Sequence, residues 1–128
     1  MDVLALAYLG DAIYELSVRT RVLERSSTAR ADRLHKAGVA YVRAEAQAAA
    51  LLKMMDEGFL SEDESALARR AHNHRIATKP KNADPVTYKW ATAFEALLGY
   101  LQLSGESARL AAVMQKAMEI TESGTSAV

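Results

Sequence analysis

The chain has 128 residues, of which 16 are basic and 16 are acidic, and it contains no cysteine. This length is enough for one domain with a single core, and the lack of cysteine excludes a disulfide framework and any thiolate metal site. Half of the residues are apolar, which excludes a disordered chain. No apolar run approaches the roughly 18 residues of a membrane span, so we expect a soluble, cytoplasmic domain with no membrane partner.

Helical periodicity runs along the chain, and no segment has a convincing strand pattern. The pattern predicts a first helix over 3–23, a polar turn over 24–28, a short helix over 30–36 with a break near Gly38, and an alanine-rich helix over 39–55. Ser61 to Glu64 form a capping box that begins a fourth helix. The periodicity stops over 72–84, which indicates a loop.

The fifth helix is apolar on nearly all sides, so we place it at the centre of the fold. Asp84 is its expected N-cap, Pro85 its first residue, and Ser104 and Gly105 its end. A last amphipathic helix is predicted over 108–120. The sequence therefore predicts an all-α domain over 1–121, followed by a flexible tail over 122–128.

Two of these helices each carry a carboxylate close to a glycine in an apolar stripe. Gly10 precedes Asp11, and Gly99 follows Glu95 by one helical turn. If the helices cross at the two glycines, the carboxylates converge, and a divalent cation is the usual way to offset such a pair. This predicts a phosphoryl-transfer site. Asp11 alone could equally be a surface acid, and Glu15 either a third contact or the partner of Arg19.

The net charge of zero hides a polarised distribution. Six basic residues and one acid lie between 69 and 89, and seven basic residues and three acids lie between 19 and 45. Such tracts are more often solvated faces than binding surfaces. His72 and His74 are only weak candidates for metal ligands, and solvated or phosphate-facing roles suit them better. Trp90 and the methionines at 54, 55, 114 and 118 are expected in the core or in dimer packing.

Four segments together resemble the ribonuclease III family. Residues 6–12 (LAYLGDA) look like the signature helix of its catalytic domain, and residues 93–100 (AFEALLGY) look like its second acidic helix. Residues 69–73 (RRAHN) and 80–84 (PKNAD) closely resemble the Mini-ribonuclease III branch, which consists of the catalytic domain alone. The match covers nearly the whole chain, in order and at compatible spacing.

This resemblance implies a homodimeric helical endonuclease that cleaves double-stranded RNA with Mg²⁺, or Mn²⁺ as a substitute, and leaves 5′-phosphate and 3′-hydroxyl ends. Asp11 and Glu95 stand at the family's catalytic, metal-binding positions. The implied substrate is the precursor of bacterial 23S ribosomal RNA, with a ribosomal protein as the partner that presents it. Because double-stranded RNA is gripped through its phosphates and 2′-hydroxyls, the RNA-binding candidates are Arg69, Arg70, Asn73, Arg75, Lys79, Lys81 and Asn82.

The chain also departs from the larger ribonuclease III enzymes. Two further acids of those enzymes are replaced here by Ala7 and Thr92. The Mini-ribonuclease III branch similarly lacks them, so the catalytic assignment is kept while the number of metal ions stays open. A separate double-stranded-RNA-binding domain is not expected. The alternatives are a catalytically silent RNA-binding or ribosome-assembly member of the fold, and a helical dimerisation module, which would leave Glu95 unexplained.

Overall fold

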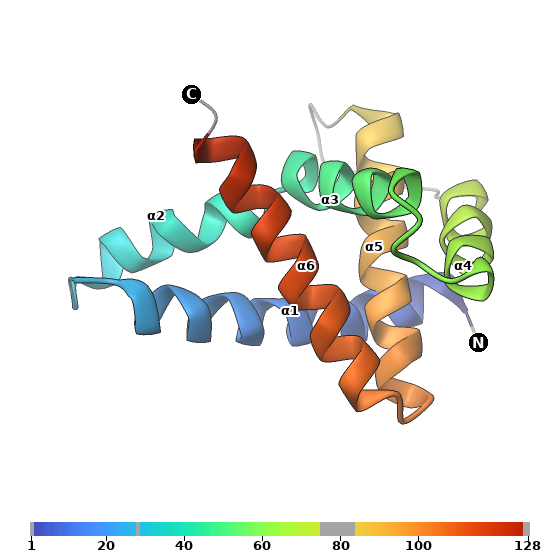
Figure 1. The fold of residues 1–128 in the computed structure, drawn as a ribbon, viewed down its shortest axis with the longest axis horizontal. Coiled ribbons are helices and arrows are strands. Elements are labelled where there is room, and N and C mark those ends of the chain that lie inside the picture. The colour runs from blue at the N-terminus through green and yellow to red at the C-terminus, as the bar shows by residue number, and fades with distance from the viewer. Residues whose placement is uncertain (1, 28, 75–83, 127–128) are drawn as a thin grey trace.

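The computed structural model describes residues 2–27, 29–74 and 84–126 (Figure 1). These ranges form helices without a strand, which confirms the predicted all-α class. The helices are α1 (Val3–Arg25), α2 (Ala31–Val42), α3 (Ala44–Asp56), α4 (Glu62–Asn73), α5 (Pro85–Leu103) and α6 (Ser107–Ser126). Within the described ranges, none of them combines the length and the apolar character needed to cross a bilayer.

Helix α5 is the centre of the core, as its apolar sequence predicts. It packs against α1, α3, α4 and α6 and crosses α1 at a steep angle (Figure 1). Phe94, Leu97 and Leu98 are fully buried. The rings of Tyr14 on α1 and Phe94 pack in a T-shaped arrangement, with 4.9 Å between their centroids. Buried Met54, Met114 and Met118 join the same cluster, so the methionines at these positions belong to the core.

Two predicted helix starts are present with their caps. The Ser61 hydroxyl accepts the backbone N–H of Glu64 at 3.1 Å, and the Glu64 carboxylate accepts the N–H of Ser61 at 2.9 Å. Asp84 caps α5 by accepting the N–H of Thr87 at 3.0 Å. Helix α4 continues through Asn73, so its last two residues are helical and the predicted loop begins too early. Residues 75–83 lie outside the described ranges.

The predicted break near Gly38 is wrong. Helix α2 runs through Gly38 to Val42, and the chain bends at Arg43, whose backbone is extended with ψ of 151°. Gly38 is buried where α2 packs on α1, and a Cβ there would meet the side chain of Val18 at an ordinary 3.8 Å. The glycine therefore marks a helix contact rather than a helix end.

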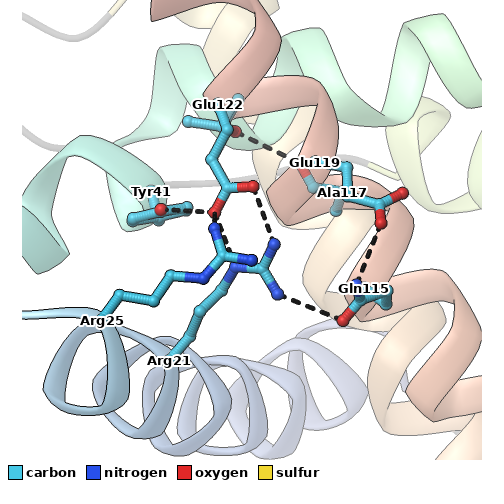
Figure 2. Close-up of polar contacts among 8 residues, drawn as sticks. Arg21, Arg25, Tyr41, Gln115, Ala117, Glu119 and Glu122 are labelled. Atoms are coloured by element: carbon cyan, nitrogen blue, oxygen red, sulfur yellow. Dashed lines mark hydrogen bonds and ion pairs between the residues drawn. The ribbon is translucent and has the colours of Figure 1, made fainter.

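The end of α6 also differs from the prediction. The helix continues to Ser126, beyond the expected end at residue 120. Its Glu122, which the sequence assigns to the tail, accepts hydrogen bonds from Arg21 at 2.6 and 2.7 Å, from Arg25 at 3.0 Å and from the Tyr41 hydroxyl at 2.7 Å (Figure 2). These donors lower the pKa of Glu122 to about 2. The cluster fixes the last turns of α6 to α1 and α2.

Candidate active site

Helices α1 and α5 cross with their backbones in contact at two glycines. A Cβ atom at Gly10 would lie 2.6 Å from the carbonyl carbon of Glu95, and one at Gly99 would lie 2.8 Å from the carbonyl carbon of Leu6. Both separations are shorter than a real Cβ contact allows. The crossing that the sequence predicts at these two glycines is present, and any side chain at either position would push the helices apart.

This crossing brings Asp11 and Glu95 together. Asp11 is exposed, whereas Glu95 is partly buried on the most apolar helix. The pKa of Glu95 is raised to about 8, first by burial and then by Asp11, both through its negative charge and through a hydrogen bond that protonated Glu95 can donate to it. The two carboxylates therefore share one partly desolvated site and repel each other when both are ionised.

Gln47 on α3 is a third member of the site, and the sequence analysis does not identify it. Its side chain is buried, with 3% of the residue exposed, and the amide donates to the carbonyl of Val42 at 3.0 Å. A hydrogen bond from this amide also lowers the pKa of Glu95, against the effects of burial and Asp11. The only signal in the sequence is an amide in an alanine-rich helix, which does not reveal its partner.

The residues present fit a magnesium ion. Among the described residues, neither Asp11 nor Glu95 pairs with a basic side chain. The neighbouring Glu15 pairs with Arg19 at 3.2 Å, and the negative charge of Glu15 further raises the pKa of Glu95. Nor do these residues include a group of three or more His, Asp or Glu side chains that could hold a metal. Magnesium commonly uses one or two carboxylates, with waters and substrate phosphate oxygens as its other ligands. Asp11 and Glu95 match that donor set.

The raised pKa of Glu95 predicts that the metal-free protein loses stability as the pH rises. Unfolded, this carboxyl titrates near 4.5, and folded, near 8, so the folded state binds the extra proton between these values. The free energy of unfolding should fall across this window by an amount on the order of a few kcal/mol. Urea titrations from pH 5 to 8.5, with a chelator present, measure this fall.

The Glu95→Gln variant is the control for this measurement, because the amide does not titrate. The difference in unfolding free energy between variant and wild type should grow with pH and level off above pH 8. The pKa values of Glu122 and Glu64 are lowered from 4.5. Their contribution to the free energy of unfolding is therefore fully present above pH 4.5 and stays constant from pH 5 to 8.5. A constant difference from pH 5 to 8.5 would contradict the assignment.

The predicted RNA-binding residues are only partly described. Arg69, Arg70 and Asn73 are exposed on the last turns of α4, and the Asn73 amide oxygen lies 3.1 Å from Nδ1 of His72. Arg75, Lys79, Lys81 and Asn82 lie outside the described residues. The His72 ring stacks on partly buried Trp90, with 3.9 Å between centroids, so His72 has a packing role.

Comparison with known proteins identifies the fold and the family. Residues 4–106 match the Ribonuclease III domain. A protein named Mini-ribonuclease 3 from Symbiobacterium thermophilum is 47% identical over 94% of this chain and 91% of its own, and one from Brevibacillus brevis is 44% identical over 93% and 87%. A crystal structure of a Fusobacterium nucleatum protein superposes with a TM-score of 0.80 at 30% identity, covering 92% of both chains. The chain therefore belongs to the ribonuclease III family, within its Mini-ribonuclease III branch of endoribonucleases.

Proposed function

We propose that Asp11 and Glu95 are the catalytic residues of this endoribonuclease and hold Mg²⁺, for which Mn²⁺ can substitute, while it cleaves double-stranded RNA. One observation carries this proposal. A partly buried glutamate and a neighbouring aspartate meet where two glycines bring α1 and α5 into backbone contact. Two carboxylates are held together there at a cost in electrostatic free energy, and a divalent cation offsets that cost.

The two carboxylates have different tasks in this mechanism. When bound, the cation activates water and stabilises the charge that develops on the phosphodiester. Exposed Asp11 lies where a phosphate can approach, while Glu95 is partly buried on the apolar helix α5. Because Glu95 is partly desolvated, its charge acts more strongly on a bound cation than an exposed carboxylate would. The products would carry 5′-phosphate and 3′-hydroxyl ends.

For the natural substrate, the family resemblance supports the precursor of bacterial 23S ribosomal RNA in the cytoplasm, presented by a ribosomal protein. Incubation of the purified chain with a long RNA duplex tests the central reaction before this substrate is used. Cleavage should require Mg²⁺, stop on addition of a chelator, and leave ends that a 5′-phosphate-dependent exonuclease degrades. Cleavage that persists in the chelator would exclude the proposed metal-dependent reaction.

A second candidate function is duplex binding without cleavage. It is favoured by the two positions that hold extra acids in the larger enzymes. Ala7 is buried against the core, and Thr92 donates its hydroxyl to the carbonyl of Tyr88 at 2.9 Å. Neither adds a carboxylate to the site. A chain that binds the duplex with Mg²⁺ present and leaves it intact would support this candidate.

We propose that the chain acts as a homodimer. Helix α1 exposes large apolar side chains at Tyr8, Leu16 and Leu23, with 84%, 70% and 63% of each residue accessible. An apolar groove of about 340 Å³ lies between α1 and α2, lined in part by Leu23, Leu34 and Val42. Large apolar side chains exposed beside an apolar groove support an interaction site on α1.

Multi-angle light scattering at micromolar concentration is expected to give twice the 13.9 kDa mass of the chain. Replacement of Leu16 by Asp should shift the protein to a monomer, because a charge buried in an apolar interface is costly. Glu24→Lys, on the same helix and exposed, is the control and should remain dimeric. A monomeric wild type at this concentration would contradict the dimer.

The end of α4 is proposed to contact RNA phosphates. The double variant Arg69→Ala and Arg70→Ala should weaken duplex binding and reduce the slope of log affinity against log salt concentration by about one for each lost phosphate contact. Fluorescence anisotropy without divalent cations measures binding alone. Arg33→Ala with Lys36→Ala, both exposed on α2, is the matched control. Equal slopes for the two double variants would show that Arg69 and Arg70 do not face RNA.

A further inference from the structure

The end of α4 holds a stacked pair of rings next to the proposed RNA-binding residues. The imidazole of His72 lies on the indole of Trp90, with 3.9 Å between the ring centroids and 18° between the ring planes. Trp90 belongs to α5 and packs against the core, whereas His72 is half-buried in the last turn of α4. One face of the imidazole is therefore covered by a ring that the core holds in place.

The edge of the imidazole is fixed as well. Nδ1 of His72 lies 3.1 Å from the side-chain amide oxygen of Asn73. An amide oxygen only accepts, so Nδ1 donates and carries the proton of the neutral ring, while Nε2 is bare. Among the described residues, Nε2 has no hydrogen-bond partner. These contacts leave Nε2 as the ring nitrogen available to a ligand.

Arg69 lies on the same face of α4 as His72. The two residues are three positions apart, and side chains at this spacing are neighbours on a helix surface. Arg69 is exposed, and no described carboxylate pairs with it. An exposed guanidinium next to His72 favours an anionic ligand, such as a phosphate group of RNA.

Two acids at this end of the molecule cap helices. Asp84 accepts the backbone N–H and the hydroxyl of Thr87 at the start of α5, and Asp2 accepts the N–H of Ala5 at the start of α1. Nε2 of His74 lies 3.9 Å from the other carboxylate oxygen of Asp2, so this histidine faces α1. The remaining ionisable side chains on the last turns of α4 and the first turns of α5 are Arg69, Arg70, Tyr88, Lys89 and Glu95.

We propose that His72 binds an RNA phosphate through Nε2 and takes up a proton there as it does so. The inference rests on the proposed contact between the end of α4 and RNA. Because a phosphate oxygen only accepts, a bare Nε2 cannot bond to it until a proton from solvent converts the ring to imidazolium. Trp90 is the positioning residue, since the partial negative charge on the face of an indole holds the imidazolium as well as the neutral ring.

A neutral His72 is the competing explanation. A bare Nε2 can accept a hydrogen bond from a 2′-hydroxyl of RNA, or the ring can serve packing alone. Neither role takes up a proton, whereas the phosphate contact makes RNA binding weaker as the pH rises. The pH dependence of RNA affinity therefore separates the phosphate contact from both alternatives.

The measurement is the Kd for a short RNA duplex by fluorescence anisotropy from pH 5.5 to 8, at constant ionic strength and without divalent cations. All proteins carry Glu95→Gln, because the pKa of Glu95 is about 8. His72→Phe keeps an aromatic ring against Trp90 and removes both ring nitrogens. The slope of log Kd against pH should be larger with His72 than with His72→Phe by up to about one, since each contact binds one proton.

His74→Gln is the matched control, because it removes the other histidine at this end of α4, which faces Asp2. It should keep the slope measured with both histidines present. Equal slopes with His72 and with His72→Phe would overturn the inference. A slope that is lost in His74→Gln and kept in His72→Phe would overturn it too, because the proton would then be bound by His74.

The double variant Arg69→Ala and Arg70→Ala separates this result from a failure of the proposed RNA contact. If that variant leaves the salt dependence of binding unchanged, the proposed contact fails and the inference fails with it. If it reduces the salt dependence while His72→Phe leaves the pH dependence unchanged, only the inference fails.

A second measurement needs no variant of His72 and holds even if His72→Phe does not fold. The ¹⁵N NMR signals of an imidazole distinguish a bare ring nitrogen from a protonated one. At a pH where this ring is neutral in the free protein, addition of the duplex should protonate Nε2 of His72, while Nδ1 stays protonated. A bare Nε2 in the RNA complex would overturn the inference.

Discussion

Alanine at Gly10 or at Gly99 is expected to lower the free energy of unfolding by about 3 kcal/mol and to remove RNA cleavage. At Gly10 the added methyl group would overlap the backbone of Glu95, and at Gly99 that of Leu6. Backbone atoms cannot rotate away as a side chain can, so the whole helix must move. Since a misplacement of about 1 Å in a catalytic group costs about 100-fold in rate, any remaining folded protein should be inactive.

Gly38→Ala is the matched control, because it adds the same methyl group to a buried helical glycine with space around it. The new Cβ would lie 3.8 Å from Val18, and removal of a helical glycine gains about 0.5–1 kcal/mol. Urea unfolding followed by circular dichroism should therefore show two destabilised variants and one of equal or greater stability. Wild-type stability in Gly10→Ala would mean that α1 and α5 do not cross as described.

These three glycines show what the sequence could and could not predict. Gly10 and Gly99 are recognisable because each lies near a carboxylate in an apolar stripe, so the helix crossing follows from the sequence. Gly38 has the same local appearance as a helix end, and only its contact with Val18 on α1 reveals its place inside α2. A glycine within a helix is unfavourable by itself, and the tertiary structure decides whether it is tolerated.

The same distinction applies to polar residues. Ser61 and Asp84 bond to backbone groups three residues away, so both caps could be predicted from local sequence. Glu122 and Gln47 bond to groups on other helices, and no local pattern indicates such partners. From the sequence alone, Glu122 is therefore expected in a flexible tail, and nothing indicates a partner for Gln47. Asp11 and Glu95 are also far apart in the sequence, but an acidic residue within an apolar helix by itself indicates a functional site.

The largest effect on activity is expected from Asp11→Asn and Glu95→Gln. Each replacement keeps the shape of the side chain and removes one of the two charges that hold the cation. A cation contributes several kcal/mol to transition-state stabilisation, so cleavage of a long duplex in Mg²⁺ should fall by roughly a thousandfold or more in either variant. Gel assays under single-turnover conditions measure this fall, and Glu24→Gln, a change in an exposed acid of α1, should retain the wild-type rate.

The stability of these variants should change in the opposite direction to their activity. Asp11 and Glu95 repel each other, and the buried carboxyl carries a desolvation cost, which together raise the pKa of Glu95 to about 8. Either amide removes the repulsion, so both metal-free variants should melt at a higher temperature than wild type at pH 8. Loss of cleavage with a gain in stability separates a catalytic role from a structural one, because a structural acid would lose both. Undiminished cleavage by either variant would show that the pair is not the catalytic site.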